Sequence, residues 1–135
     1  MSDAKVELVK SWLIKADHDL KSARELAAAS EPLLDTAIYH CQQAAEKAIK
    51  GFLVYKDIRF EKTHDIDLLI SLAVDMEPRL SSMRQAAELL TPYATEFRYP
   101  GQYVEPEPAE FEEALEAAKD FYGFILSLLP QEVHP

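Results

Sequence analysis

The sequence predicts an all-α fold, an antiparallel up-and-down bundle of four to five helices. Apolar residues recur every three to four positions in each long segment, which is the period of an amphipathic helix, and no segment shows the alternation of a strand. Breaks rich in proline or polar residues separate these segments at 30–32, 56–63 and 77–78. Because short connections place successive helices antiparallel, the segments are expected to form one bundle.

Two long helices are expected first, over residues 3–29 and 35–55. Ser2 or Asp3 can accept a free backbone N–H at the start of the first helix. Gly51 lies inside the second helix and weakens it by about 1 kcal/mol relative to alanine. The apolar stripes of the two helices are Val6, Val9, Leu13, Ala16, Leu20, Ala23, Ala27 and Ile38, Cys41, Ala45, Ala48, Phe52, Tyr55.

Two further helical segments follow in the middle of the chain. A short helix is expected over residues 65–76, with Thr63 or Asp65 as its cap. A fourth apolar stripe extends over residues 80–97. Pro92 lies inside this stripe, so it either kinks the helix or begins a separate turn at the residue before it.

The last helix is expected over residues 109–129, and Pro130 ends it, so residues 130–135 should form a frayed tail. A chain of this length can bury one core, so residues 1–135 are interpreted as a single helical domain. No apolar run approaches the ~20 residues that cross a bilayer, and the first residues lack a secretory signal. With one cysteine, Cys41, interpreted as a buried small hydrophobe, we expect a cytoplasmic protein with no membrane association.

The formal net charge of −10 argues against broad, non-specific binding to nucleic acid. The charge is uneven along the chain, with basic residues gathered at Lys47, Lys50, Lys56, Arg59 and Lys62. A run of acidic residues follows at Glu105, Glu107, Glu110, Glu112, Glu113, Glu116 and Asp120. Each run is either a solvated helix face or a docking surface, and the acidic run could dock a basic partner surface.

No metal or cofactor motif is present in the sequence. The three glycines are scattered, so there is no phosphate-binding loop. The four histidines are dispersed, which excludes zinc spacing, and the single Glu-x-x-His pair, Glu61 with His64, falls short of the two that a di-iron bundle uses. No nucleophile–base constellation can be read from spacing. We therefore expect no cofactor.

Two sets of polar residues each allow a structural and a functional interpretation. The first is a stripe at helical spacing, either an exposed helix edge or a ligand site, made by His40, Gln43, Lys47 and Lys50. The second is His64 with Asp65 at a helix start, where both can satisfy free backbone groups or His64 can serve catalysis.

Four segments, in chain order, resemble the HEPN family and together cover nearly the whole chain. Residues 40–51, which read HCQQAAEKAIKG, resemble the second-helix signature of that family. Residues 62–65 (KTHD) resemble the entry to its third helix, and residues 97–100 (FRYP) resemble the Arg-Tyr-Pro before its last helix. The first-helix pattern of the family is resembled by five residues of this chain, Trp12, Ala16, Asp17, Asp19 and Leu20.

The resemblance implies a small bacterial or archaeal helical bundle that forms a homodimer. Members of the family are often paired with a minimal nucleotidyltransferase, sometimes as a toxin–antitoxin system, so the resemblance also implies such a partner. Many HEPN domains are metal-independent ribonucleases, in which an arginine and a histidine after four to six residues act across the dimer interface. Apolar residues beside the main stripes independently favour a helix-mediated homodimer, namely Trp12, Ile14, Ile49 and Phe121.

The chain departs from the ribonuclease motif at Tyr103, which stands where a histidine would follow Arg98. A tyrosine with a pKa of about 10 is a poor base at neutral pH, so we favour a non-catalytic protein. If activity exists, the candidate catalytic residues are Arg98 and His64. The candidate nucleotide-binding residues, which supply positive charge or a stacking ring, are Arg98, Tyr99, Tyr103, Lys47, Lys50 and His40.

Three functions stay open at this point. The first is a non-catalytic homodimer that binds a nucleotide or a nucleotidyltransferase. The second is an RNA endonuclease with an atypical site around Arg98, and the third is a helical dimer that acts only in protein interaction. A salt bridge of Arg98 with Glu96 or Glu105 would favour the third function over the first.

Overall fold

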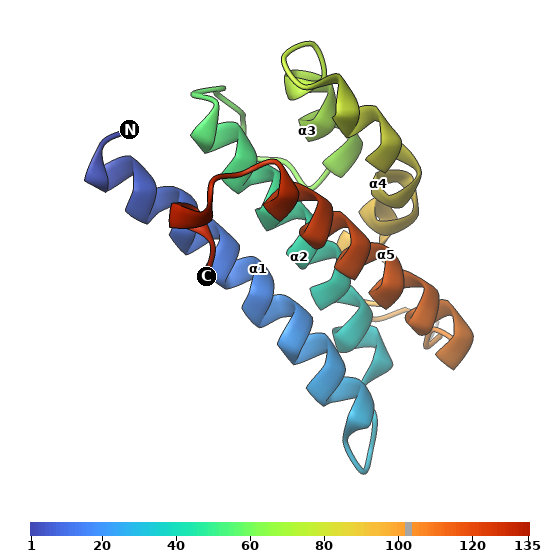
Figure 1. Ribbon diagram of the computed structural model, residues 1–135. Coiled ribbons are helices and arrows are strands. Elements are labelled where there is room, and N and C mark those ends of the chain that lie inside the picture. The colour runs from blue at the N-terminus through green and yellow to red at the C-terminus, as the bar shows by residue number, and fades with distance from the viewer. Residues whose placement is uncertain (102–103) are drawn as a thin grey trace.

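The computed structural model describes residues 1–101 and 104–135, and these form helices and turns without a strand, as the sequence predicts. The helices are α1 (Asp3–Ala28), α2 (Leu34–Tyr55), α3 (Ile66–Ala73), α4 (Arg84–Leu90) and α5 (Pro108–Ser127). Turns of 3-10 helix cover Pro78–Met83, Thr91–Ala94 and Gln131–Val133. In Figure 1, α1 and α2 form an antiparallel hairpin, α5 lies along it, and α3 and α4 lie on the other side of α2 from α1.

The caps that the sequence predicts for α1 and α3 are present. The Ser2 hydroxyl accepts the backbone N–H of Lys5 at 3.2 Å, and the Asp65 carboxylate accepts that of Leu68 at 3.1 Å. Each bond satisfies an amide that the start of a helix leaves without a partner. Pro108 lies in the first turn of α5, where its missing N–H removes no intrahelical bond.

A Schellman motif ends α2. Asp57 adopts the left-handed conformation with φ of 60°, and its N–H donates to the carbonyl of Val54 at 3.1 Å. The next amide, that of Ile58, donates to the carbonyl of Leu53 at 2.9 Å. The chain then returns to the bundle, where Ile58 and Phe60 are partly buried against the core.

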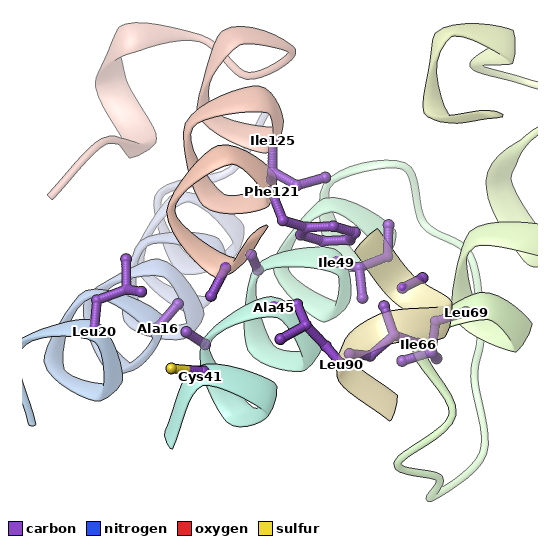
Figure 2. Close-up of a cluster of buried hydrophobic side chains, with 14 of the residues drawn as sticks. Ala16, Leu20, Cys41, Ala45, Ile49, Ile66, Leu69, Leu90, Phe121 and Ile125 are labelled. Atoms are coloured by element: carbon purple, nitrogen blue, oxygen red, sulfur yellow. The ribbon is translucent and has the colours of Figure 1, made fainter. Parts of the chain in front are cut away.

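The core is centred on α2, which the other four helices cover. Figure 2 shows side chains of α2 facing those of α1, α3, α4 and α5. The labelled members are Ala16 and Leu20 of α1, Cys41, Ala45 and Ile49 of α2, Ile66 and Leu69 of α3, Leu90 of α4, and Phe121 and Ile125 of α5. This arrangement leaves most of α2 buried, so its polar residues must find partners inside the protein.

Gly51 lets α1 lie close to α2. A Cβ atom added at Gly51 would lie 3.1 Å from Cβ of Trp12 and 3.5 Å from Cδ2 of Leu13. A 3.1 Å approach between two Cβ atoms is closer than side chains ordinarily reach. The glycine therefore weakens the helix locally but allows a close approach of the two long helices at this point.

The segment predicted as a fourth helix is divided into three pieces. The turn Pro78–Met83 comes first, α4 follows, and Thr91–Ala94 forms a separate 3-10 turn. The separate turn is thus the alternative that occurs at Pro92. The helix α3 is shorter than predicted and ends at Ala73, followed by a turn that reaches Met76.

The tail after α5 differs from the frayed segment that we expected. Val133 is fully buried, and the ring of His134 lies 2.9 Å and 3.1 Å from the carbonyl oxygens of Leu126 and Leu129. The 3-10 turn Gln131–Val133 therefore closes over the end of α5 and contacts α1. The burial of one apolar side chain and the free carbonyls of the helix end explain this packing.

Some of the apolar side chains that favoured a dimer in the sequence are buried within the single chain. Ile49 and Phe121 are fully buried in the core, and Trp12 is half-buried beside Phe60. Exposed leucines instead lie on α3, at Leu68 and Leu72. In the described part of the chain, no helix combines the length and apolarity needed to cross a membrane.

Candidate functional site

The second-helix signature folds into a buried network around Glu46, here called the Glu46 cluster. Its members are Gln42, Gln43, Glu46 and Lys50 of α2 and His64 from the segment before α3. One Glu46 carboxylate oxygen accepts from Gln42 at 3.2 Å, from Gln43 at 3.3 Å and from Nδ1 of His64 at 2.7 Å. The other oxygen accepts from Nζ of Lys50 at 2.9 Å.

Hydrogen bonds decide the charge state of Glu46. Burial by itself would raise its pKa, but hydrogen bonds from Lys50, His64 and Gln42 and the positive charge of Lys50 outweigh burial. The pKa of Glu46 is therefore held below its ordinary value of 4.5, and the side chain is an anion at neutral pH.

Lys50 is the buried cation of the Glu46 cluster. Its ammonium lies 5.9 Å from the ring centre of Trp12 and 5.7 Å from that of Phe60. The amide of Gln42 also donates to the backbone carbonyl of His64 at 2.9 Å. The cluster thus joins α1, α2 and the segment before α3, and it holds α3 at the position where Asp65 caps it.

A second network, here called the Asp19 cluster, joins α1 to α2. Asp19 is buried, with one carboxylate oxygen 2.7 Å from Nδ1 of His40 and the other 2.8 Å from Nζ of Lys47. The bond to Asp19 orients the His40 ring and leaves Nε2 as its outer nitrogen.

The segment after α4 carries Arg98 toward α2. The Tyr93 hydroxyl donates to the Glu110 carboxylate at 2.6 Å, which ties this segment to α5. Burial, followed by the hydrogen bond to Glu110, raises the pKa of Tyr93. The rings of Tyr93 and Phe97 stack with centres 6.1 Å apart, and Phe97 takes a left-handed φ of 67°. The chain therefore turns sharply just before Arg98.

Arg98 lies on the face of Tyr39, with its guanidinium carbon 3.7 Å from the ring centre. Stacking uses the face of the guanidinium, so its N–H groups keep their in-plane directions for an anion. Tyr39 in turn makes an edge-to-face contact with the ring of His40, with centres 5.7 Å apart. The three side chains form a continuous row from the loop to the first turns of α2.

These side chains line a pocket of about 270 Å³, here called the Arg98 pocket. Its lining residues are Asp35, Thr36, Tyr39, His40, Phe97 and Arg98. The Asp35 carboxylate accepts the backbone N–H of Thr36 at 2.7 Å, which draws it toward the helix start. The volume lies near the lower end for small-molecule sites, so it suits a phosphate group with part of a nucleotide.

The structure brings together only some of the candidate residues. His40 and Arg98 share the Arg98 pocket, and Lys47 adjoins it through Asp19. Lys50 and His64 belong to the Glu46 cluster instead. Tyr99 is 70% exposed, and Tyr103 lies outside the residues that the structure describes.

Two residues of this region were missed in the sequence. Tyr39 precedes the signature and sits outside its polar stripe, so helical spacing gave no sign that it would meet Arg98. Asp19 belongs to the first-helix pattern and lies between Ala16 and Ala23 of the apolar stripe, a spacing that signals a buried acid in need of partners. Cys41 is buried as predicted, and burial, with a smaller contribution from the charge of Glu112, raises its pKa to about 12.

No metal centre is apparent among residues 1–101 and 104–135, since no three His, Cys, Asp or Glu side chains gather closely enough to hold an ion. Every buried side-chain nitrogen and oxygen in the same ranges has a hydrogen-bond partner. The buried polar atoms of the Glu46 cluster therefore have partners within the protein, although the side chain of His64 is exposed, whereas the Arg98 pocket is open to a ligand.

The bundle, with an α2 that buries its polar signature and an arginine before the last helix, defines a HEPN-type helical protein. The HEPN domain family matches residues 9–128, and the chain belongs to this family. It therefore shares the family's helical fold, as the sequence motifs implied.

Two solved structures are similar over most of their lengths. One is ST0689, described as an archaeal HEPN homologue, with 27% identity, a TM-score of 0.69, and coverage of 89% of this chain and 96% of that one. The other is TT1696 from Thermus thermophilus, with 27% identity, a TM-score of 0.70, and coverage of 90% of this chain and 98% of that one. No curated protein matches the chain significantly.

Proposed function

We propose that this HEPN protein is a non-catalytic binder of nucleotides, and that the Arg98 pocket is its binding site. The observation that carries the proposal is the row of Arg98, Tyr39 and His40 along one open pocket. Arg98 supplies N–H donors with bidentate geometry for a phosphate, and the exposed ring of Tyr99 offers a stacking surface for a base.

The charges around the pocket suit one phosphate better than a long polyanion. Arg98 provides N–H donors and His40 contributes its ring, while Asp35 places a carboxylate on the rim. Asp19 already engages Lys47, so the charge of this lysine serves the Asp19 cluster first. A mononucleotide or nucleoside triphosphate therefore fits this surface better than an extended nucleic acid, in keeping with the net charge of −10.

Thermal unfolding against a panel of nucleoside triphosphates tests the proposal. A ligand at about 100 times its dissociation constant stabilises a fold by about 2.7 kcal/mol, so an increase in Tm is expected for the wild type. Arg98→Ala should abolish the increase, whereas Arg79→Ala, which removes an exposed arginine paired with Glu77, should keep it. A panel without any increase for the wild type would reject the proposed site.

A second candidate function is metal-independent RNA cleavage, and one observation favours it. His40 is held by Asp19 through Nδ1, and its ring lines the same pocket as Arg98. In such a reaction, Nε2 of His40 would accept the 2′-hydroxyl proton while that oxygen attacks phosphorus. The bond from phosphorus to the 5′-oxygen would break, this oxygen would take a proton from water, and Arg98 would stabilise the phosphorane charge. His40 thus replaces His64 as the candidate base.

Cleavage of a short RNA in the presence of a chelator separates the two functions. The second function predicts 2′,3′-cyclic phosphate ends that disappear in His40→Gln and Arg98→Ala and persist in His64→Gln. If the wild-type protein leaves the RNA intact and nucleotides raise its Tm, the result would support nucleotide binding and reject RNA cleavage.

The remaining proposals concern partners. We propose a homodimer, supported by the exposed leucines Leu68 and Leu72 of α3 and by membership of the HEPN family. The family resemblance also supports a minimal nucleotidyltransferase partner in a toxin–antitoxin-like pair. Light scattering at several concentrations tests the dimer, since a monomeric mass at every concentration would reject it.

A further inference from the structure

A groove of about 660 Å³ follows the line between α4 and α5, away from the residues of the Arg98 pocket. Its floor is apolar and half-buried, made by Met83, Ala86 and Leu89 on one side and by Ala117 of α5 on the other. An apolar floor that stays open to solvent between two helices is the surface into which an amphipathic helix can lay its apolar face.

One rim of the groove is strongly acidic. Glu113, Glu116 and Asp120 line it at spacings of one and two turns of α5, and all three are exposed. Lys119 makes only a long contact of 3.6 Å with Glu116, and both side chains are largely solvated. The opposite rim carries the uncharged Ser82 and Gln85. The groove therefore presents a one-sided negative field above an apolar floor.

We propose that the α4–α5 groove docks a basic amphipathic helix of a partner protein. The apolar side chains of that helix would lie on the floor, and its lysines or arginines would face the acidic rim. Charge complementarity selects this occupant, because a second copy placed symmetrically would bring two sets of the same three carboxylates together. The proposal is independent of nucleotide binding, since no lining residue is shared between the two surfaces.

Binding of a synthetic peptide to the full chain tests the proposal. The probe is a fluorescent helical peptide of about 15 residues, roughly four turns, with leucines on one face and lysines along one edge. The comparison peptide has the same composition with the leucines distributed around the helix. Fluorescence anisotropy should show binding of the amphipathic peptide and at least about tenfold weaker binding of the scrambled one.

A matched pair of triple variants locates the binding surface. Glu113→Gln with Glu116→Gln and Asp120→Asn removes the rim charges and should weaken the amphipathic peptide by about tenfold. Glu7→Gln with Glu31→Gln and Glu112→Gln removes as many exposed charges outside the groove and should leave the affinity unchanged. Glu112 is a close control because it also lies on α5 but does not line the groove. Its charge instead contributes to the raised pKa of Cys41 on α2. Circular dichroism checks that both triples keep the fold.

Three outcomes would overturn the proposal. The first is no binding of the amphipathic peptide to the wild type. The second is equal weakening by the two triples, or equal binding of the two peptides, because either would reduce the effect to net charge. The third is a change in the oligomeric state of the free chain on neutralising the rim, which would assign the groove to a second copy.

Discussion

The carboxylate of Glu46 shows how one residue of the signature can serve structure rather than ligand binding. It is almost fully buried, and its oxygens accept from Lys50, His64 and two glutamines. Burying an unpaired carboxylate is costly, so the surrounding donors are what makes its position tolerable. The string from His40 to Gly51 therefore identifies the family while most of its polar atoms face inward.

Replacing Glu46 should reveal its contribution to stability and its pH dependence. Glu46→Gln leaves the buried ammonium of Lys50 without its counter-ion, which should cost roughly 3–5 kcal/mol at pH 7. Because the folded-state pKa of Glu46 is depressed, its contribution is complete above pH 4.5, its ordinary pKa, and is lost as the pH falls through the folded value.

Chemical unfolding at pH 7 and across pH 5–3 measures both effects. The wild type should lose more stability between pH 5 and 3 than Glu46→Gln does. Glu7→Gln, which changes an exposed carboxylate, should behave like the wild type. Parallel pH profiles for the wild type and Glu46→Gln would contradict the role given to the cluster.

The Cys41 thiol should be inert in the folded protein. It is fully buried, and its pKa of about 12 leaves almost no thiolate at pH 8. A thiol-specific reagent should therefore react no faster than the chain unfolds, and should label one thiol at once in denaturant. Rapid labelling of native protein would place Cys41 at the surface.

At the scale of elements, two glycines in long helices are predicted to respond in opposite ways. Gly51 faces Trp12 and Leu13 of α1 at close range, so Gly51→Leu should overpack the α1–α2 contact and cost about 1–3 kcal/mol. Gly123 lies in α5 with open space around its Cβ position, so Gly123→Ala should stabilise the protein by up to about 1 kcal/mol. Denaturant midpoints of the two variants measure this difference, and a loss of stability in Gly123→Ala would contradict it.

The sequence predicted the long elements well, for physical reasons that also show its limits. The apolar stripes of α1, α2 and α5 determine which faces are buried, and local caps at Ser2 and Asp65 determine where two helices begin. Pro92 allowed both a kink and a separate turn, and only the packing of Tyr93 against α5 distinguishes them. The tail was expected to fray because Val133 alone gave no sign of its place in the core.

At the scale of the whole molecule, tertiary contacts decide which polar residues can meet a ligand. The four members of the predicted polar stripe on α2 divide between two networks, with His40 and Lys47 at Asp19 and Gln43 and Lys50 at Glu46. Helical spacing placed them on one face but could not show which of them would already have hydrogen-bond partners within the protein. The stacking of Arg98 on Tyr39 depends on the turn at Phe97, and no local sequence pattern predicted this turn.

The most direct test of the central claim is an NMR titration of the histidine side chains with the nucleoside triphosphate that raises Tm most. We predict that the ring resonances of His40 shift with saturation, while those of His64, held in the Glu46 cluster, and His134, held at the end of α5, stay in place. The His40 shift should disappear in Arg98→Ala. Shifts at His64 with His40 unchanged, or no shift at any histidine, would contradict binding at the Arg98 pocket.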